Sequence, residues 1–158
     1  MLKARTLFTL LLLLFLLASA QTSYAGIKVT KDDCPVFISI HEMGDQVIQY
    51  PKGSYSMMGL ATGFLADKFP LNVNFKTLTT FVSVSRYQPT VSAMVLSDST
   101  GKTSMGRTEF DMKFARPGTM YTQLVDWKAV FPAEGFYAIN IFVDGTLVGY
   151  YPFYVGLR

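Results

Sequence analysis

The chain has 158 residues, which is enough for one domain with a sizeable hydrophobic core. Its 14 basic and 11 acidic residues give a net charge of +3, but two of the positive charges, Lys3 and Arg5, lie at the extreme N-terminus. Without them 12 basic and 11 acidic side chains remain, and no run of Lys or Arg resembles a phosphate-binding patch. The composition therefore predicts that the protein does not bind nucleic acid.

The first 25 residues have the layout of a secretory signal peptide. A short basic start precedes a nearly unbroken apolar run over residues 7–17, and two small-x-small sites follow, ending at Ala20 and Ala25. The run is shorter than the about 20 apolar residues that a membrane span needs. We therefore predict a leader over residues 1–25, cleaved after Ala20 or Ala25, a periplasmic or secreted protein, and no stable membrane span after leader removal.

Residues 26–158 are predicted to form a single domain. Most of its hydrophobic pattern has a period of two, which is typical of strands. In RTEFDMKF, residues 107–114, the side chains alternate between a charged set and a largely apolar set. Because successive side chains of a strand point to opposite faces, this segment predicts a sheet with one face in water, which favours antiparallel pairing.

The other predicted elements follow in chain order, and turn sequences rich in Gly, Pro, Asp or Ser separate them. In the first segment, Val36, Ile38 and Ile40 are expected to share one face. Only Leu60–Phe69 and Asp126–Phe131 have helical character, and the second is expected to be a single turn that Asp126 caps. About seven to nine short strands in a domain of this size indicate a β-sandwich. The predicted strands occupy residues 36–41, 55–62, 75–85, 90–96, 107–114, 119–125, 136–143 and 146–155.

The closing stretch, residues 131–155, is predicted to be an aromatic hairpin. Asp144-Gly145 is a strong signal for a two-residue turn between its strands. Pro152 lacks an N–H group, so the last strand is expected to be an edge strand or to have a bulge there. A glycine two residues before Tyr137 resembles the tyrosine corner of immunoglobulin-like sandwiches, in which the hydroxyl bonds to a nearby backbone group. The alternative is that Tyr137 is an ordinary core aromatic.

Several of these segments together resemble a family of uncharacterised bacterial β-sandwich proteins, immunoglobulin-like in fold and without an assigned function. The resemblance implies a single antiparallel β-sandwich over most of the mature chain. It implies no catalytic residue, because the family has no assigned activity. The matching segments are VFISIHE, SMMGLAT, Phe69-Pro70, the Asp98–Gly101 turn, and PAEGFYAINIFVDG with PFYV.

The sequence offers little for catalysis or metal binding. Its one histidine, His41, and one cysteine, Cys34, are seven residues apart, about 23 Å along an extended strand, and do not make a usual structural zinc site. Glu109 and Asp111 alternate with basic residues, as on a solvated face. We therefore predict no catalytic residue, no metal, no cofactor and no enzymatic activity. Cys34 has no internal disulfide partner, and whether it forms an intermolecular bridge stays open.

Aromatic surface is the remaining functional signal. Trp127, in a predicted loop before the closing hairpin, and Tyr150, Tyr151 and Tyr154 of the last strand form the predicted binding surface. Exposed aromatic side chains anchor protein partners and stack on sugars. We therefore predict a non-enzymatic exported protein that binds an envelope or extracellular protein. The alternative is a carbohydrate-binding module that uses the same aromatics, and these side chains can also simply close the open end of the sandwich.

Overall fold

The structure, a computed structural model, describes residues 34–51, 53–86 and 88–158. This part of the chain contains ten strands and no helix, so the protein is all-β. It therefore contains no helix with the length and hydropathy of a membrane-spanning segment. The predicted leader, residues 1–25, lies outside the described residues.

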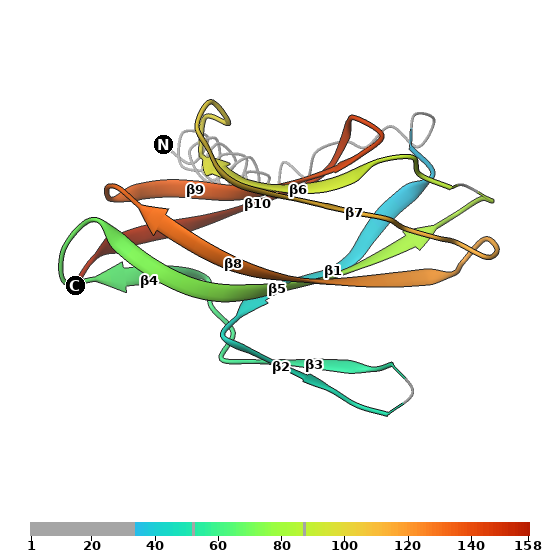
Figure 1. The fold of residues 1–158 in the computed structure, drawn as a ribbon, viewed down its shortest axis with the longest axis horizontal. Helices are drawn as coiled ribbons and strands as arrows, with labels where there is room; N and C mark the ends of the chain where they lie inside the picture. Colours follow the sequence, from blue (N-terminus) through green and yellow to red (C-terminus); the bar gives the residue numbers. More distant parts are fainter. Residues whose placement is uncertain (1–33, 52, 87) are drawn as a thin grey trace, which may run out of the picture.

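Two sheets form the two layers of the fold (Figure 1). The first sheet has the strand order β1-β5-β8, and the second has the order β4-β10-β9-β6-β7. A two-stranded hairpin, β2–β3, projects from the side of the first sheet that faces away from the second (Figure 1). The strands are β1 (Val36–Gly44), β2 (Gln46–Gln49), β3 (Tyr55–Met58), β4 (Gly63–Ala66), β5 (Leu71–Ser83), β6 (Ser92–Asp98), β7 (Ser104–Phe110), β8 (Met120–Phe131), β9 (Gly135–Val143) and β10 (Thr146–Leu157).

The second sheet is mixed rather than purely antiparallel. β4 pairs with β10 in parallel, from Gly63 opposite Tyr154 to Ala66 opposite Leu157. The prediction of a purely antiparallel sandwich is wrong at this pair. The chain reaches β4 by crossing from the β2–β3 hairpin to the other layer, so no tight turn forces it to run antiparallel to its neighbour.

The β9–β10 hairpin closes the core as the sequence predicts. Asp144 and Gly145 form the two-residue turn, with positive φ angles of 47° and 80°. Tyr137 and the alternating side chains Ile139 and Ile141 are buried between the sheets. The Tyr137 hydroxyl donates a hydrogen bond to the Ala133 carbonyl at 2.6 Å, which is the bond that the predicted corner requires.

Pro152 lies where β10 has β9 as its only ladder partner, because β4 pairs with β10 only from Tyr154 onward. Pro152 itself therefore needs no second ladder partner, but the prediction that the last strand is an edge strand is wrong, because β10 lies between β4 and β9 in the sheet. This stretch of edge is nevertheless covered by β1. A Cβ atom added at Gly149 would lie 2.6 Å from the Ile38 side chain, so the two strands are in close contact.

Both segments with predicted helical character lack a helix. Leu60–Phe69 contains β4, and Asp126–Phe131 is the end of β8. In the second segment Trp127, Ala129 and Phe131 are buried and the side chains between them are exposed, so the period is two. Six residues are too few to distinguish the two patterns locally. The uninterrupted antiparallel pairing of β8 with β5 determines the outcome.

β1 contains a bulge that changes which side chains point inward. Its pairing with β5 shifts between Ile38 and Ile40, which leaves Ser39 as the extra residue. Val36 is buried, but Ile40 is 50% exposed, so the prediction that they share a face is wrong. After the bulge the inward position passes to His41.

Candidate binding surface

The outer face of β9 and β10 carries three exposed aromatic side chains. Phe136 is 61% exposed, Tyr150 40% and Tyr154 38%. Phe136 and Tyr154 lie opposite each other in the ladder, with ring centroids 5.1 Å apart. Leu65 of the adjacent strand β4 is also exposed and lies on the same face. We call these four residues the outer aromatic patch.

Strand alternation accounts for the patch. The closing hairpin buries Tyr137, Ile139 and Phe153, so the intervening aromatic residues must face outward. The sequence left open which aromatic set of the last strand points out, and the structure places Tyr150 and Tyr154 there. The Tyr154 hydroxyl donates a hydrogen bond to the Glu134 carboxylate, and this bond raises the pKa of Tyr154 because it favours the neutral hydroxyl.

Phe136 and Leu65 are the patch residues that the sequence prediction missed. Tyr137 faces inward whether it is a corner or a core aromatic, and the alternation of a strand then requires Phe136 to face water. The signal for Phe136 is therefore present in the sequence. Leu65 lies in a segment with predicted helical character, so strand alternation could not identify it.

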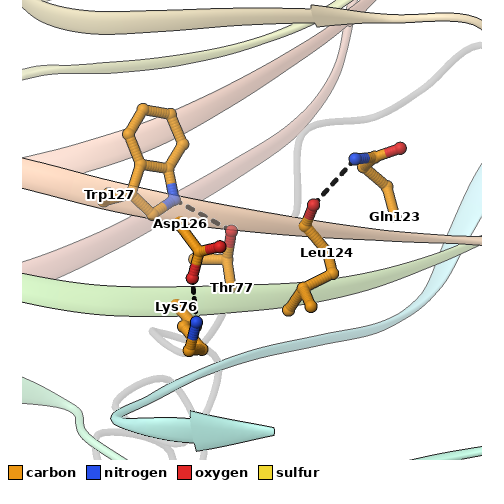
Figure 2. Close-up of polar contacts among 6 residues, drawn as sticks. All are labelled: Lys76, Thr77, Gln123, Leu124, Asp126 and Trp127. Carbon is orange, nitrogen blue, oxygen red and sulfur yellow. Dashed lines mark hydrogen bonds and ion pairs between the residues drawn. The ribbon is translucent and has the colours of Figure 1, made fainter. Parts of the chain in front are cut away.

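Trp127 is a core residue, and the prediction that it is exposed in a loop is wrong. It lies within β8, is 4% exposed and stacks on Phe75 with ring centroids 6.2 Å apart. Its indole N–H donates to the Thr77 hydroxyl at 2.9 Å, as Figure 2 shows. On the side of β7, a Cβ atom added at Gly106 would lie 3.3 Å from the indole ring. Trp127 is therefore not available to a ligand.

Tyr151 lies at the seam between β1 and β10 rather than in the patch. Its ring stacks on His41, with centroids 3.9 Å apart, and both side chains are half-buried. His41 Nδ1 lies 2.8 Å from the Thr79 hydroxyl oxygen, within hydrogen-bond distance. Burial lowers the pKa of His41 to about 4. The seam contains a cleft of about 190 Å³ that these side chains and Pro152 help to line.

The comparisons with known proteins place the chain in a family. Residues 40–156 match the family described as "Family of unknown function (DUF6941)". The chain belongs to this family. No curated protein matches the chain.

Two of the solved structures that resemble this DUF6941 chain do so at low identity. The Pseudomonas fluorescens alkylpurine DNA glycosylase AlkC, bound to DNA containing an abasic site analog, is 13% identical with a TM-score of 0.45, over 78% of this chain and 31% of that one. The β-glucosidase from Listeria innocua in complex with glucose is 11% identical with a TM-score of 0.41, over 74% of this chain and 16% of that one. The DUF6941 chain spans less than a third of the length of either structure.

The side of the β5–β8 ladder opposite Trp127 is polar. Figure 2 shows Lys76 of β5 paired with Asp126 of β8, on the side away from the indole. Together with Asn74 and Lys128, they border a shallow cleft of about 300 Å³. Among the described strands, β8 has hydrogen bonds only to β5, so its other edge is unpaired from Met120 to Phe131. The sequence prediction did not identify this edge.

The described part of the DUF6941 chain contains no group of three or more His, Cys, Asp or Glu side chains that can hold a metal ion. Cys34 is a free thiol in the core. Burial raises the pKa of this thiol, which disfavours the nucleophilic thiolate.

Proposed function

We propose that this DUF6941 chain is a non-enzymatic exported protein that binds an envelope or extracellular protein through the outer aromatic patch. The exposure of Phe136, Tyr150 and Tyr154 on one sheet face, with Phe136 and Tyr154 in contact, is the observation that supports the proposal. Contiguous exposed apolar groups mark interaction sites, and aromatic side chains contribute strongly to binding when a partner covers them.

The geometry of the patch favours a protein partner over a sugar. The rings of Phe136 and Tyr154 meet at 57°, so this pair does not form the flat platform on which a sugar ring stacks. Trp127, which the carbohydrate alternative requires, is buried. The Glu134 carboxylate beside Tyr154 adds an acceptor for a basic side chain of the partner.

Two other parts of the proposal come from other regions of the chain. The basic start, apolar run and small-x-small sites of residues 1–25 support export with leader removal. The hydrogen bond between Tyr137 and Ala133 supports an immunoglobulin-like relationship for the closing strands.

A pull-down from envelope extracts tests the contact surface. The parent is compared with a double variant, Phe136→Ser with Tyr150→Ser, and with the control Met120→Ser, an exposed apolar residue on the other sheet. We expect the double variant to retain the melting temperature of the parent and to lose a partner that both parent and control capture. A folded double variant that captures every partner of the parent would contradict the proposal.

A glycan array with the same three proteins separates the carbohydrate alternative. We expect that any glycan that binds the parent also binds the double variant, so that binding does not depend on Phe136 and Tyr150. A glycan that binds the parent and control but not the double variant would instead show that the patch is a sugar site.

A further inference from the structure

The free edge of β8 lacks most of the features that protect the other strand edges. Proteins block such edges with short strands, bulges, proline or charged side chains, and β8 has only the last of these, at Asp126 and Lys128. β4 has four residues, β7 has seven with a shifted register against β6, and β1 contains a bulge. β8 has twelve residues, no proline or glycine, and an uninterrupted register with β5 from Met120 to Phe131. Among the described strands, none is hydrogen-bonded to this edge, so its backbone groups can pair with another strand, although β7 comes close to β8 near Trp127.

The backbone groups of the even-numbered β8 residues face this edge. The Ser83 N–H donates to the Thr119 carbonyl at 3.4 Å, so Thr119 is hydrogen-bonded to β5. Bonded and non-bonded positions alternate in an antiparallel ladder. Odd-numbered residues of β8 therefore bond to β5, and even-numbered residues direct N–H and C=O outward. The Leu124 carbonyl agrees with this assignment, because the Gln123 side-chain amide reaches it at 2.7 Å (Figure 2).

The side chains along the edge are complementary to a second copy of themselves. Asp126 and Lys128 are both exposed and share the outer face of the sheet. If two β8 strands pair antiparallel about Trp127, Asp126 of each chain lies opposite Lys128 of the other. Two other registers keep the even-numbered residues of the two chains bonded to each other, one centred on Asp126 and one centred on Lys128. Each places a charged side chain opposite its own copy, and like charges directly opposite each other are unfavourable. The central register also places Leu124 opposite Val130, both apolar.

We propose that two copies of this chain pair through β8, antiparallel and centred on Trp127. The two three-stranded sheets then form one continuous sheet with the order β1-β5-β8-β8-β5-β1. The interface is isologous, because the same strand contributes both halves. Arg107 and Glu109 of β7, the edge strand of the second sheet nearest β8, form an ion pair at 2.8 Å. Because their charges cancel, this pair does not repel an approaching second copy. The Leu124 carbonyl keeps a second lone pair for the new strand.

Sedimentation equilibrium and residue-resolved amide hydrogen exchange on the full purified protein test this proposal. We expect a dimer, and we expect the N–H groups of Asp126 and Lys128 to become protected as the protein concentration rises. The odd-numbered neighbours, already bonded to β5, are protected at every concentration. A protein that stays monomeric up to about 1 mM overturns the proposal. A dimer in which exchange at Asp126 and Lys128 does not depend on concentration also overturns it.

Charge variants test the register. Lys128→Glu places acids opposite each other twice per dimer, and we expect the dimer dissociation constant to rise about tenfold. Adding Asp126→Lys restores opposite charges and is expected to recover most of the affinity. Lys68→Glu, an exposed lysine outside β8, is the control and leaves the constant unchanged. A single variant without effect, or a double variant as weak as the single one, contradicts this register.

Discussion

The surroundings of His41 hold its imidazole in the neutral form. Tyr151 covers one face of the ring, and the Thr79 hydroxyl oxygen lies 2.8 Å from Nδ1, within hydrogen-bond distance. Burial lowers the pKa of His41 from its ordinary value of 6.5 to about 4. The unfolded chain therefore binds this proton more readily than the folded chain does.

Acid is expected to destabilise the fold through His41. Because the unfolded state binds more protons, the free energy of unfolding rises with pH across this window. The contribution is fully present above about pH 6.5 and is lost as the pH falls through about 4, for a total of about 3 kcal/mol. Urea unfolding of the parent at pH 7, 5 and 4 measures this loss.

His41→Phe is the matched control, because it retains an aromatic ring against Tyr151 but does not titrate. The carboxylates titrate in both proteins, so the difference between the two pH curves isolates the histidine. Curves that run parallel from pH 7 to pH 4 would show that His41 makes no contribution.

The β9–β10 hairpin is the element in which local sequence and tertiary structure agree most closely. Asp144 and Gly145 favour positive φ angles, and both adopt them. The alternation of apolar side chains then directs Ile139 and Ile141 between the sheets, where both are buried. We expect this element to carry a large share of the stability of the fold.

Ile141→Ala tests that expectation. Ile141 is 0% exposed, so truncation removes buried apolar area and leaves a cavity, at a cost of about 2–5 kcal/mol in the free energy of unfolding. Urea denaturation measures the cost. Phe136→Ala, on the outer face of the same strand, is the control and is expected to change stability by less than about 0.5 kcal/mol. A loss at Ile141 no larger than that at Phe136 would rule out this assignment of the two faces.

The elements that the sequence did not predict are those fixed by distant strands. Asp126–Phe131 fits a helical turn as well as a strand when considered alone, and its long ladder with β5 decides between them. Tyr151 follows the alternation of its strand, but only the passage of β1 across the seam places His41 on it. The all-β class and the closing hairpin depend on local pattern and were accessible from sequence. Alternation also required one aromatic set of the last strand to face outward, but the structure was needed to show that this set is Tyr150 and Tyr154.

On the scale of the whole molecule, the two proposed surfaces lie on different sheets. The outer aromatic patch belongs to the five-stranded sheet, and the free edge of β8 belongs to the three-stranded sheet. A dimer formed through β8 leaves both patches uncovered by the pairing strands. Two linked patches would bind a partner with repeated sites more tightly than one patch does, because the second contact becomes intramolecular.

Export with leader removal is the prediction that concerns the whole chain. The intact mass of the protein from an envelope fraction is expected to lack residues 1–20 or 1–25, because leader peptidases cut after small residues such as Ala20 and Ala25. Mass spectrometry of the unmodified protein distinguishes the two sites. A mass that includes Met1 would contradict export by this route.

The bulge at Ser39 divides β1 into two halves of opposite phase. Before it, the even-numbered Val36 is buried, whereas after it the odd-numbered Met43 is buried and His41 is stacked. Polar substitutions along β1 are therefore expected to be tolerated at odd-numbered positions before the bulge and at even-numbered positions after it. A relative that lacks the extra residue would align with this strand by sequence on one side of the bulge and be displaced by one position on the other.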